Sequence, residues 1–223
     1  MLKPRKRLTK KKLKEDKLLT FYVKASKWYE AYSKYVLGGV VAIVFVIAAV
    51  LFFKNSARKA EAAASVELAR AMRVYSAEDY SNSIAMLSSL VDGSGSTRSG
   101  KMALLYLANS FYKTGDYDNA YSYYKKFLAK FDKVDYFSAY AMGSMASCIE
   151  QKGDYAEAAS QYEKAASKFP REYLAPGYLF RAARCYSLAG NNAKALPLYQ
   201  KIIDDYPDSQ QQEDAIIQKA LLE

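Results

Sequence analysis

The chain has 223 residues, a formal net charge of +10, two cysteines and no histidine. The absence of histidine excludes histidine-based general-base catalysis and histidine metal sites. Two cysteines are too few for a disulfide scaffold or a zinc cluster. The sequence also contains no glycine-rich phosphate loop, metal-ligand cluster or nucleophile–base pair, so we expect neither an enzyme nor a bound cofactor.

The positive charge is concentrated at the N-terminus. Residues 1–34 carry a net charge of +9, whereas residues 54–223 carry a net charge of +1. The basic tail, residues 1–16, is expected to contact anionic lipid, because each basic residue near such a surface contributes about 1 kcal/mol. A contact with the ribosome or the translocon is the alternative for this tail, and no nucleic-acid partner is expected.

Residues 17–35 are predicted to form an amphipathic helix next to a membrane. Apolar residues recur there at intervals of three or four, which is typical of a helix. Aromatic residues interleaved with lysine suit a helix in the headgroup zone. The apolar stripe consists of Leu18, Phe21, Ala25, Trp28, Tyr32 and Tyr35.

Residues 36–53, VLGGVVAIVFVIAAVLFF, contain no charged residue. As a helix they span about 27 Å, against roughly 30 Å of bilayer hydrocarbon, so they can cross a membrane. A core helix would be amphipathic, and this segment is apolar on all sides. A cleavable signal peptide has a shorter lead than the 35 residues found here. We therefore expect an uncleaved membrane anchor.

Basic residues near the apolar segment predict its orientation. Twelve of them precede the segment, whereas the first twenty residues after it carry five. The positive-inside rule places the N-terminus in the cytoplasm and residues 54–223 on the far side of the membrane. In a bacterium, that side is the periplasm or the outer surface.

After the apolar segment, the sequence repeats with a period of 37–38 residues. Gly115-Asp116-Tyr117 recurs as Gly153-Asp154-Tyr155, and a third copy begins at Gly190. Alanine follows each glycine after five residues and tyrosine after nine residues. These positions are Ala120, Ala158 and Ala195, and Tyr124, Tyr162 and Tyr199. A weaker copy at Glu78-Asp79-Tyr80 lacks the glycine.

Each copy is predicted to form two antiparallel helices. The glycine ends the first helix in the left-handed conformation, and Asp116 or Asp154 caps the second. The alanines let the helices approach closely, and the recurring tyrosine fills the space between neighbouring units. Because one helix pair cannot bury its own apolar face, the units must stack. Residues 208–223 are predicted to form a last helix that covers the final unit.

Cys148 and Cys185 each lie five residues before a repeat glycine, at equivalent places in successive helices. Neighbouring helices are about 8–10 Å apart, whereas a disulfide requires Cα atoms within about 7 Å of each other. We therefore expect two buried thiols. A disulfide between them is the alternative if the compartment is oxidising.

The order of small residues, glycine, alanine, aromatic residue and proline resembles the tetratricopeptide repeat, in four copies over residues 64–207. The implied fold is all-α, with one N-terminal transmembrane helix, an α-solenoid of about four helix pairs and a C-terminal capping helix. The period exceeds the usual length of about 34 residues, so we expect extra loop residues, for example at 93–100. The first copy lacks the glycine, which leaves its turn geometry open. The expected domains are 1–16, 17–35, 36–53 and 54–223.

First helices of tetratricopeptide proteins line a curved groove that binds peptides or partner helices. The resemblance implies three partner-binding positions on the first helix of each of copies two to four. They are Asn109, Tyr112, Lys113, Ser147, Glu150, Gln151, Arg184, Ser187 and Leu188. Lys113 and Arg184 are candidates to contact a carboxylate, with ordinary solvated charges as the alternative.

The complete layout resembles the YfgM-like family of bacterial inner-membrane proteins. It combines a basic tail, an aromatic-rich approach helix, one span and repeats beyond the membrane. That family associates with the Sec translocon and a membrane-anchored periplasmic chaperone. The resemblance implies an inner-membrane adaptor with periplasmic repeats that helps exported polypeptides reach folding factors.

Two alternative functions stay open. One is a scaffold for envelope or outer-membrane assembly. No cysteine near the span is available to carry a lipid, which counts against a lipid-anchored scaffold. The other is a receptor with cytosol-facing repeats, which requires the orientation opposite to the one that the charges predict.

Overall fold

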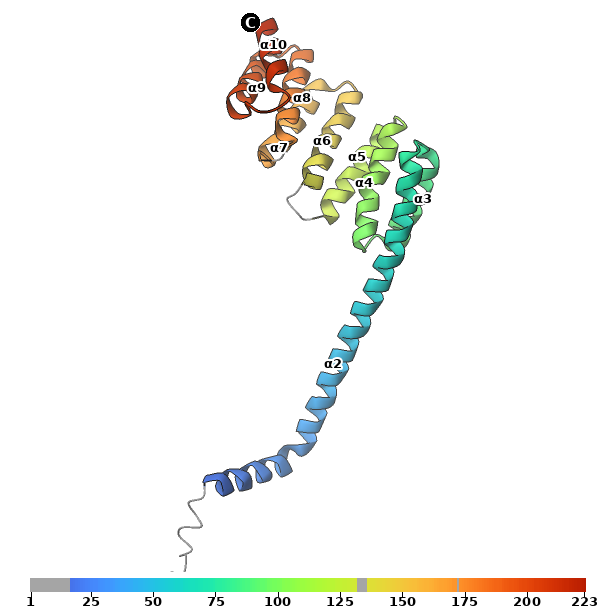
Figure 1. The fold of residues 1–223 in the computed structure, drawn as a ribbon, viewed down its shortest axis with the longest axis vertical. Helices are drawn as coiled ribbons and strands as arrows, with labels where there is room; N and C mark the ends of the chain where they lie inside the picture. Colours follow the sequence, from blue (N-terminus) through green and yellow to red (C-terminus); the bar gives the residue numbers. More distant parts are fainter. Residues whose placement is uncertain (1–16, 132–135, 172) are drawn as a thin grey trace, which may run out of the picture. The chain divides into compact units, whose positions relative to one another are not determined.

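The computed structural model describes residues 17–131, 136–171 and 173–223, which form nine α-helices and no strand (Figure 1). The predicted lipid-binding tail, 1–16, lies outside the described residues. The chain divides into two compact units, Met1–Ala57 and Arg58–Glu223. The helices are α2 (Lys17–Ser76), α3 (Tyr80–Ser94), α4 (Arg98–Lys113), α5 (Tyr117–Lys130), α6 (Tyr136–Gln151), α7 (Tyr155–Lys168), α8 (Ala175–Leu188), α9 (Asn192–Asp205) and α10 (Gln212–Leu222).

The predicted apolar segment lies within α2. The most apolar part of this helix has a mean hydropathy of 3.0, and none of it is buried. In the described part of the chain, α2 is the one helix long and apolar enough to cross a bilayer. Because none of this apolar part is buried, it disagrees with the core-helix alternative and is compatible with a single membrane anchor.

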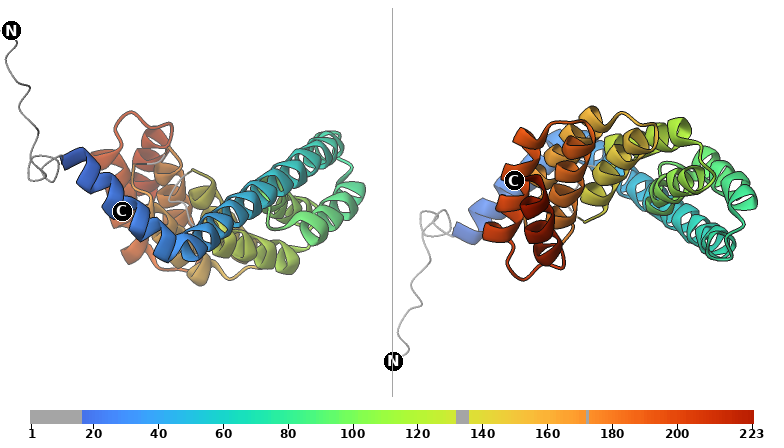
Figure 2. Two further views of the ribbon diagram at one scale, coloured as in Figure 1. Left: turned by 90° about the horizontal axis from the view of Figure 1, so that it is seen from below. Right: turned by 90° about the horizontal axis from the view of Figure 1, so that it is seen from above.

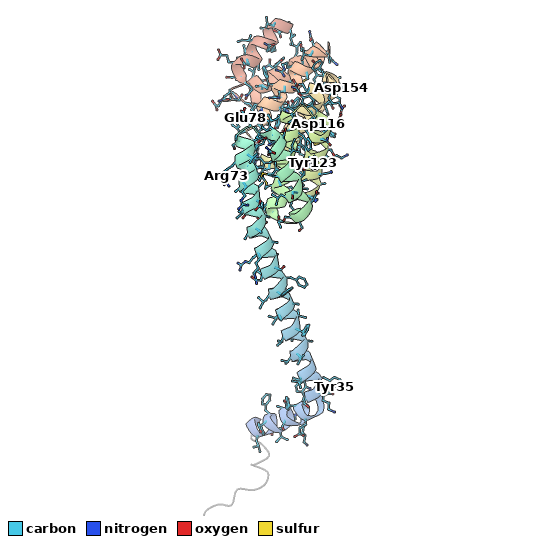
Figure 3. All side chains as sticks on the ribbon, turned by 90° about the vertical axis from the view of Figure 1, so that its right-hand side faces the viewer. Tyr35, Arg73, Glu78, Asp116, Tyr123 and Asp154 are labelled. Carbon is cyan, nitrogen blue, oxygen red and sulfur yellow. The ribbon has the colours of Figure 1, made fainter. Side chains whose placement is uncertain are left out.

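Within the first unit, α2 bends close to Tyr35, just before Gly38 and Gly39 (Figure 3). Paired glycines are a common position for such a bend. Ring centroids lie 5.6 Å apart for Trp28 and Tyr32, and 6.5 Å apart for Tyr32 and Tyr35. These rings therefore share one helix face, as the stripe predicts. The backbone of α2 is helical across positions 35–36 and 53–54, and the domain boundaries at these positions stay predictions.

The second unit is a series of helix pairs joined by three clusters of buried side chains. One cluster joins α2, α3 and α4, the next joins α4, α5 and α6, and the last joins α6 to α10. Figure 2 shows α3 to α10 following a curve. This arrangement confirms the solenoid of about four pairs. It also confirms the cap, since Ala215 of α10 is fully buried in the last cluster.

The turns inside the second, third and fourth pairs have the predicted glycine. Gly115, Gly153 and Gly190 have φ angles of +81°, +84° and +75°, in the left-handed region that glycine tolerates. Asp116 and Asp154 then cap α5 and α7 by accepting hydrogen bonds from backbone N–H groups three residues later. Asparagine takes this capping role at the start of α9.

The first copy forms the same turn without a glycine. Glu78 has a φ of +62°. The backbone N–H groups of Glu78 and Asp79 donate to the carbonyl oxygens of Tyr75 and Val74, and those of Gly115 and Asp116 make the equivalent bonds. Figure 3 labels Glu78, Asp116 and Asp154 at three such turns. The first turn therefore has the same hydrogen-bonded geometry as the other turns, and the backbone of Glu78 is strained as a result.

Glu78→Gly is expected to raise the free energy of unfolding by about 0.5–1 kcal/mol. The left-handed conformation costs an ordinary residue about 1–2 kcal/mol, part of which is offset by the greater unfolded-state freedom of glycine. Urea unfolding of the full chain in detergent measures the change. Ala77→Gly, one residue earlier and outside the left-handed region, is the control and should lower stability. Equal effects of the two substitutions would contradict strain at Glu78.

The repeated residues occupy the predicted core positions. Ala120, Ala158 and Ala195 are fully buried, and the tyrosines at the ninth position are at most 2% exposed. Both cysteines are buried and unpaired with each other, which confirms the expectation of free thiols. Burial raises the pKa of Cys148 and of Cys185 to about 12, so neither thiol is reactive at neutral pH.

The expected extra loop at 93–100 is mostly helical. α3 continues to Ser94, and α4 begins at Arg98. Thr97 makes this early start favourable, because its Oγ1 accepts a hydrogen bond from the Gly100 N–H at 2.9 Å. Glu61 of α2 adds a second stabilising contact, since the Ser99 hydroxyl donates to its carboxylate at 2.7 Å.

Candidate partner-binding site

The first helices of all four repeats border one hollow of about 460 Å³. α2, α4, α6 and α8 each contribute to its wall, and Gln210 and Gln211, just before α10, also line it. Six tyrosines dominate the wall, and we call the site the tyrosine hollow. They are Tyr75, Tyr112, Tyr124, Tyr140, Tyr173 and Tyr178.

Asn109 organises one side of the tyrosine hollow. Its Oδ1 accepts hydrogen bonds from the hydroxyls of Tyr124, at 2.5 Å, and Tyr140, at 3.2 Å. Burial raises the pKa of both tyrosines, so the hydroxyls stay protonated and act as donors. Because the Asn109 oxygen faces these hydroxyls, its amide nitrogen is left as a donor for other acceptors.

Tyr178 of α8 also lines the tyrosine hollow. Its ring stacks on Tyr162, with centroids 6.1 Å apart and planes at 24°. The ring occupies space that a side chain at Gly143 would need, since a Cβ there would lie 2.2 Å from two ring atoms of Tyr178. The glycine of α6 thus allows a tyrosine of α8 to lie flat against the preceding repeat.

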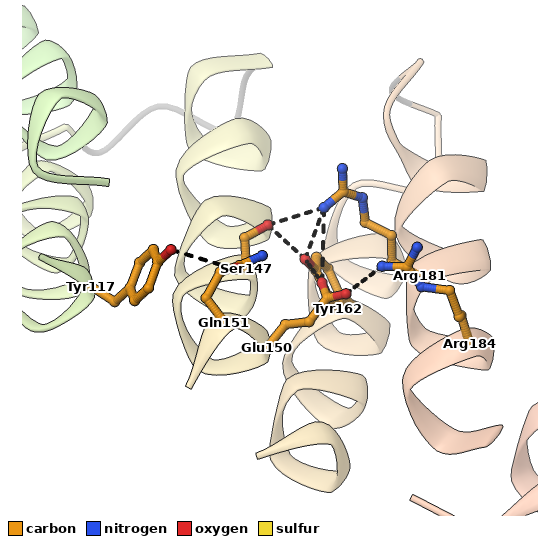
Figure 4. A network of polar contacts seen from close by, with 7 residues as sticks. All are labelled: Tyr117, Ser147, Glu150, Gln151, Tyr162, Arg181 and Arg184. Atoms are coloured by element: carbon orange, nitrogen blue, oxygen red, sulfur yellow. Dashed lines mark hydrogen bonds and ion pairs between the residues drawn. The ribbon is translucent and has the colours of Figure 1, made fainter. Parts of the chain in front are cut away.

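A polar network between repeats three and four lies beside the tyrosine hollow (Figure 4). Glu150 is at its centre, and its side chain is 8% exposed. The Tyr162 hydroxyl donates to Glu150 at 2.7 Å, and the Arg184 guanidinium pairs with the same carboxylate. Arg181 donates to the Tyr162 hydroxyl at 3.2 Å and to Ser147 Oγ at 3.3 Å. The network therefore fixes the side chains of two neighbouring first helices.

Four of the nine predicted partner-binding residues line the tyrosine hollow. They are Asn109, Tyr112, Lys113 and Ser147. Glu150 and Arg184 are engaged with each other instead. Gln151 accepts a hydrogen bond from Tyr117 at 3.4 Å. Ser187 donates to Asn192 at 3.3 Å, and Leu188 is 57% exposed without lining the hollow. Binding of a partner by any of the nine stays a prediction.

Several lining residues were missing from the sequence-based set. Tyr140 and Ser144 precede Ser147 by seven and three residues, and Gly177 and Arg181 precede Arg184 by the same intervals. Residues at these spacings share a helix face. Extending the predicted positions by two turns toward each helix start would have found them. Tyr124 and Gln211 come from other elements and carry no such signal.

Comparisons with known proteins agree with this fold. The family model described as "Tetratricopeptide repeat-like domain" matches residues 26–220. Among solved structures, 44 chains match. One is the crystal structure of the nearly identical TPR-like repeats of a Podosopora anserina putative kinesin light chain. It is 13% identical with a TM-score of 0.58, and the alignment covers 71% of this chain and 84% of that chain.

A crystal structure of a single-substitution variant of the same repeats is 14% identical, with a TM-score of 0.57 and the same coverage. Identities this low demonstrate a shared fold and nothing more specific. A comparison with curated proteins gave no match. The family model covers the repeats, the cap and most of the apolar helix. The chain therefore belongs to the tetratricopeptide repeat-like domain family.

Proposed function

We propose that this protein is a membrane-anchored adaptor whose tyrosine hollow binds polypeptide partners. Repeat folds of this kind are generally interaction scaffolds. The observation that carries the proposal is one hollow bordered by the first helices of all four repeats, in a chain that also contains an exposed apolar helix. Asn109, Tyr112, Lys113 and Ser147 are the proposed contacts.

We further propose that the anchor crosses the bacterial inner membrane once and leaves the repeats in the periplasm. The excess of basic residues before the apolar segment supports this orientation. The proposed partners are the Sec translocon, a membrane-anchored periplasmic chaperone and the exported polypeptides that they handle. The layout supports these partners through its resemblance to the YfgM-like family. The family model begins to match at residue 26, before the apolar segment. This supports the view that the apolar segment and the repeats occur together in the family.

Site-specific crosslinking in intact membranes tests this function. A photo-crosslinking phenylalanine analogue replaces Tyr112 inside the tyrosine hollow, and adducts are identified by mass spectrometry. We expect translocon or periplasmic chaperone subunits, or exported chains, among the adducts. The matched control carries the analogue at Ile217 of α10, which is 51% exposed and outside the hollow. It should give these adducts at much lower yield.

Three outcomes would overturn the proposal. Adducts with cytosolic proteins alone would reverse the orientation. Adducts with outer-membrane assembly factors alone would favour a scaffold for envelope assembly. Equal yields from Tyr112 and Ile217 would mean that the tyrosine hollow is not the binding site.

A further inference from the structure

Residues 19–35 of α2, which we call the aromatic arm, expose six large aromatic side chains. They are Phe21, Tyr22, Trp28, Tyr29, Tyr32 and Tyr35, and each is between 49% and 79% exposed. Four of these rings belong to the predicted stripe, and Tyr22 and Tyr29 add two more. Large exposed apolar patches mark places where a partner or a membrane covers a protein. The aromatic arm therefore needs an occupant for this face.

The six rings lie on one face of the helix. Successive residues of an α-helix are about 100° apart, so intervals of four and seven residues keep Phe21, Trp28 and Tyr32 together. Tyr22 and Tyr29 are also seven residues apart and widen the same face. The backbone of α2 is helical throughout this range, so the aromatic arm has one broad aromatic face.

The other side of the aromatic arm is positively charged. Lys27 and Lys34 are exposed and seven residues apart, and Lys34 lies about 200° around the helix from Tyr32. Lys24, one turn before Trp28, is exposed at the edge of the aromatic face. Glu30 is the single acidic residue of the arm. Aromatic and cationic faces on one helix fit the surface of a bilayer with anionic headgroups.

The aromatic arm is continuous with the apolar segment 36–53. Both belong to the first compact unit, and α2 bends between them, close to Tyr35 and just before Gly38 and Gly39 (Figure 3). When the apolar segment crosses a bilayer, the arm is held near the bilayer surface, where its effective concentration is high. A second copy of the chain would have to lose translational freedom to cover the same face. This continuity favours lipid as the occupant.

We propose that the aromatic arm lies along the surface of the bilayer that the apolar segment crosses. Its rings enter the layer between headgroups and acyl chains, where aromatic side chains are favoured, and its lysines attract anionic headgroups. The arm thereby fixes the depth of the apolar segment, which at about 27 Å is shorter than the roughly 30 Å of hydrocarbon. The proposal rests on the membrane anchor of the proposed function and is independent of the tyrosine hollow.

Trp28 reports the position of the arm, because it is the only tryptophan of the chain. The full chain is reconstituted in vesicles of phosphatidylcholine and phosphatidylglycerol in equal amounts, with lipids brominated near the top or near the end of the acyl chains. We expect blue-shifted emission and stronger quenching by the shallow bromines than by the deep ones. A straight helix would instead place Trp28, eight residues before position 36, about 12 Å outside the hydrocarbon.

Matched serine substitutions locate the face that contacts lipid. Phe21→Ser with Tyr35→Ser removes rings seven residues before and after Trp28, on the same face. Acrylamide quenching of Trp28 should increase, and quenching by bromine should decrease. The control is Leu19→Ser with Val23→Ser, because both positions are two residues from Phe21, about 200° around the helix. The control should leave the quenching of Trp28 unchanged.

Lysine substitutions test the preference for anionic lipid. For the unchanged chain, acrylamide should quench Trp28 less in the mixed vesicles than in vesicles of phosphatidylcholine alone. Lys24→Gln, Lys27→Gln and Lys34→Gln together should remove this difference. The matched control replaces three exposed cations beyond the apolar segment with glutamine and should keep the difference. These cations are Lys54, Arg58 and Lys59.

The outcomes separate this proposal from the proposed function. Release of the chain from the vesicles by alkaline carbonate would reject the membrane anchor and the proposed function with it. A retained chain whose Trp28 shows water-like emission would reject the arm contact alone. Protection of Trp28 from acrylamide without quenching by bromine would assign the aromatic face to a second copy. Equal effects of the two serine pairs, or equal acrylamide quenching in the two kinds of vesicle, would also overturn the proposal.

Discussion

Tyr162→Ala is expected to lower the free energy of unfolding by about 3–5 kcal/mol, the usual cost of deleting a buried aromatic ring. The side chain is fully buried. Its ring stacks on Tyr178 of the next repeat, and its hydroxyl donates to Glu150. The substitution therefore removes packing between repeats and leaves a buried carboxylate with fewer donors. Chemical denaturation of the full chain, followed by circular dichroism, measures the change.

Two further tyrosine substitutions separate the causes. Tyr162→Phe keeps the ring and removes the hydroxyl, so we expect a loss of about 1–2 kcal/mol. Tyr155→Ala, at the start of the same helix α7, removes a ring that is 36% exposed and should therefore lower stability by clearly less than Tyr162→Ala. A Tyr162→Ala protein as stable as the Tyr155→Ala protein would mean that the ring does not join the repeats.

Gly143→Ala is expected to lower the free energy of unfolding by about 1–3 kcal/mol, the typical cost of overpacking. Alanine is normally the better helix residue by about 1 kcal/mol. At this position its Cβ would lie 2.2 Å from the Tyr178 ring, and the ring has to move off Tyr162 to make room. Chemical denaturation measures the loss, and near-ultraviolet circular dichroism reports the displaced tyrosine.

Gly177→Ala is the matched control for this substitution. Gly177 lies in the first helix of the next repeat and lines the same hollow. The nearest neighbour of an added Cβ is Gln211 Nε2 at 4.0 Å, so the methyl group meets no obstacle and helix propensity should dominate. We expect unchanged or slightly increased stability. A loss equal to that of Gly143→Ala would exclude the Tyr178 ring as the cause.

The features that could be predicted from the sequence depend on local chemistry. A glycine followed by aspartate specifies a helix end and the next helix start, whatever surrounds it, and both turns at Gly115 and Gly153 form as expected. Alanine and tyrosine at fixed distances from these turns likewise fall on the buried face. Even the first copy keeps the turn, because packing of its neighbours outweighs the strain at Glu78.

The features that were missed depend on how neighbouring repeats meet. Sequence spacing placed Glu150 and Arg184 on groove positions, but 34 residues separate them, and the packing of successive repeats brings the two side chains together. The contacts of Arg181 with Tyr162 and Ser147 likewise join different helices, so spacing within one repeat could not indicate them. The space at Gly143 is filled by a ring from another repeat, which no pattern within one repeat could indicate.

α2 serves both compact units, because it contains the apolar segment and also ends as the first helix of the first repeat. In a membrane, mechanical load on a polypeptide held by the repeats would pass through residues 58–76 to reach the lipid. This part of α2 is followed directly by the turn that holds Glu78 in its strained conformation. Local unfolding of residues 58–76 would leave the apolar segment in the membrane and connect it to the other repeats through an unfolded chain.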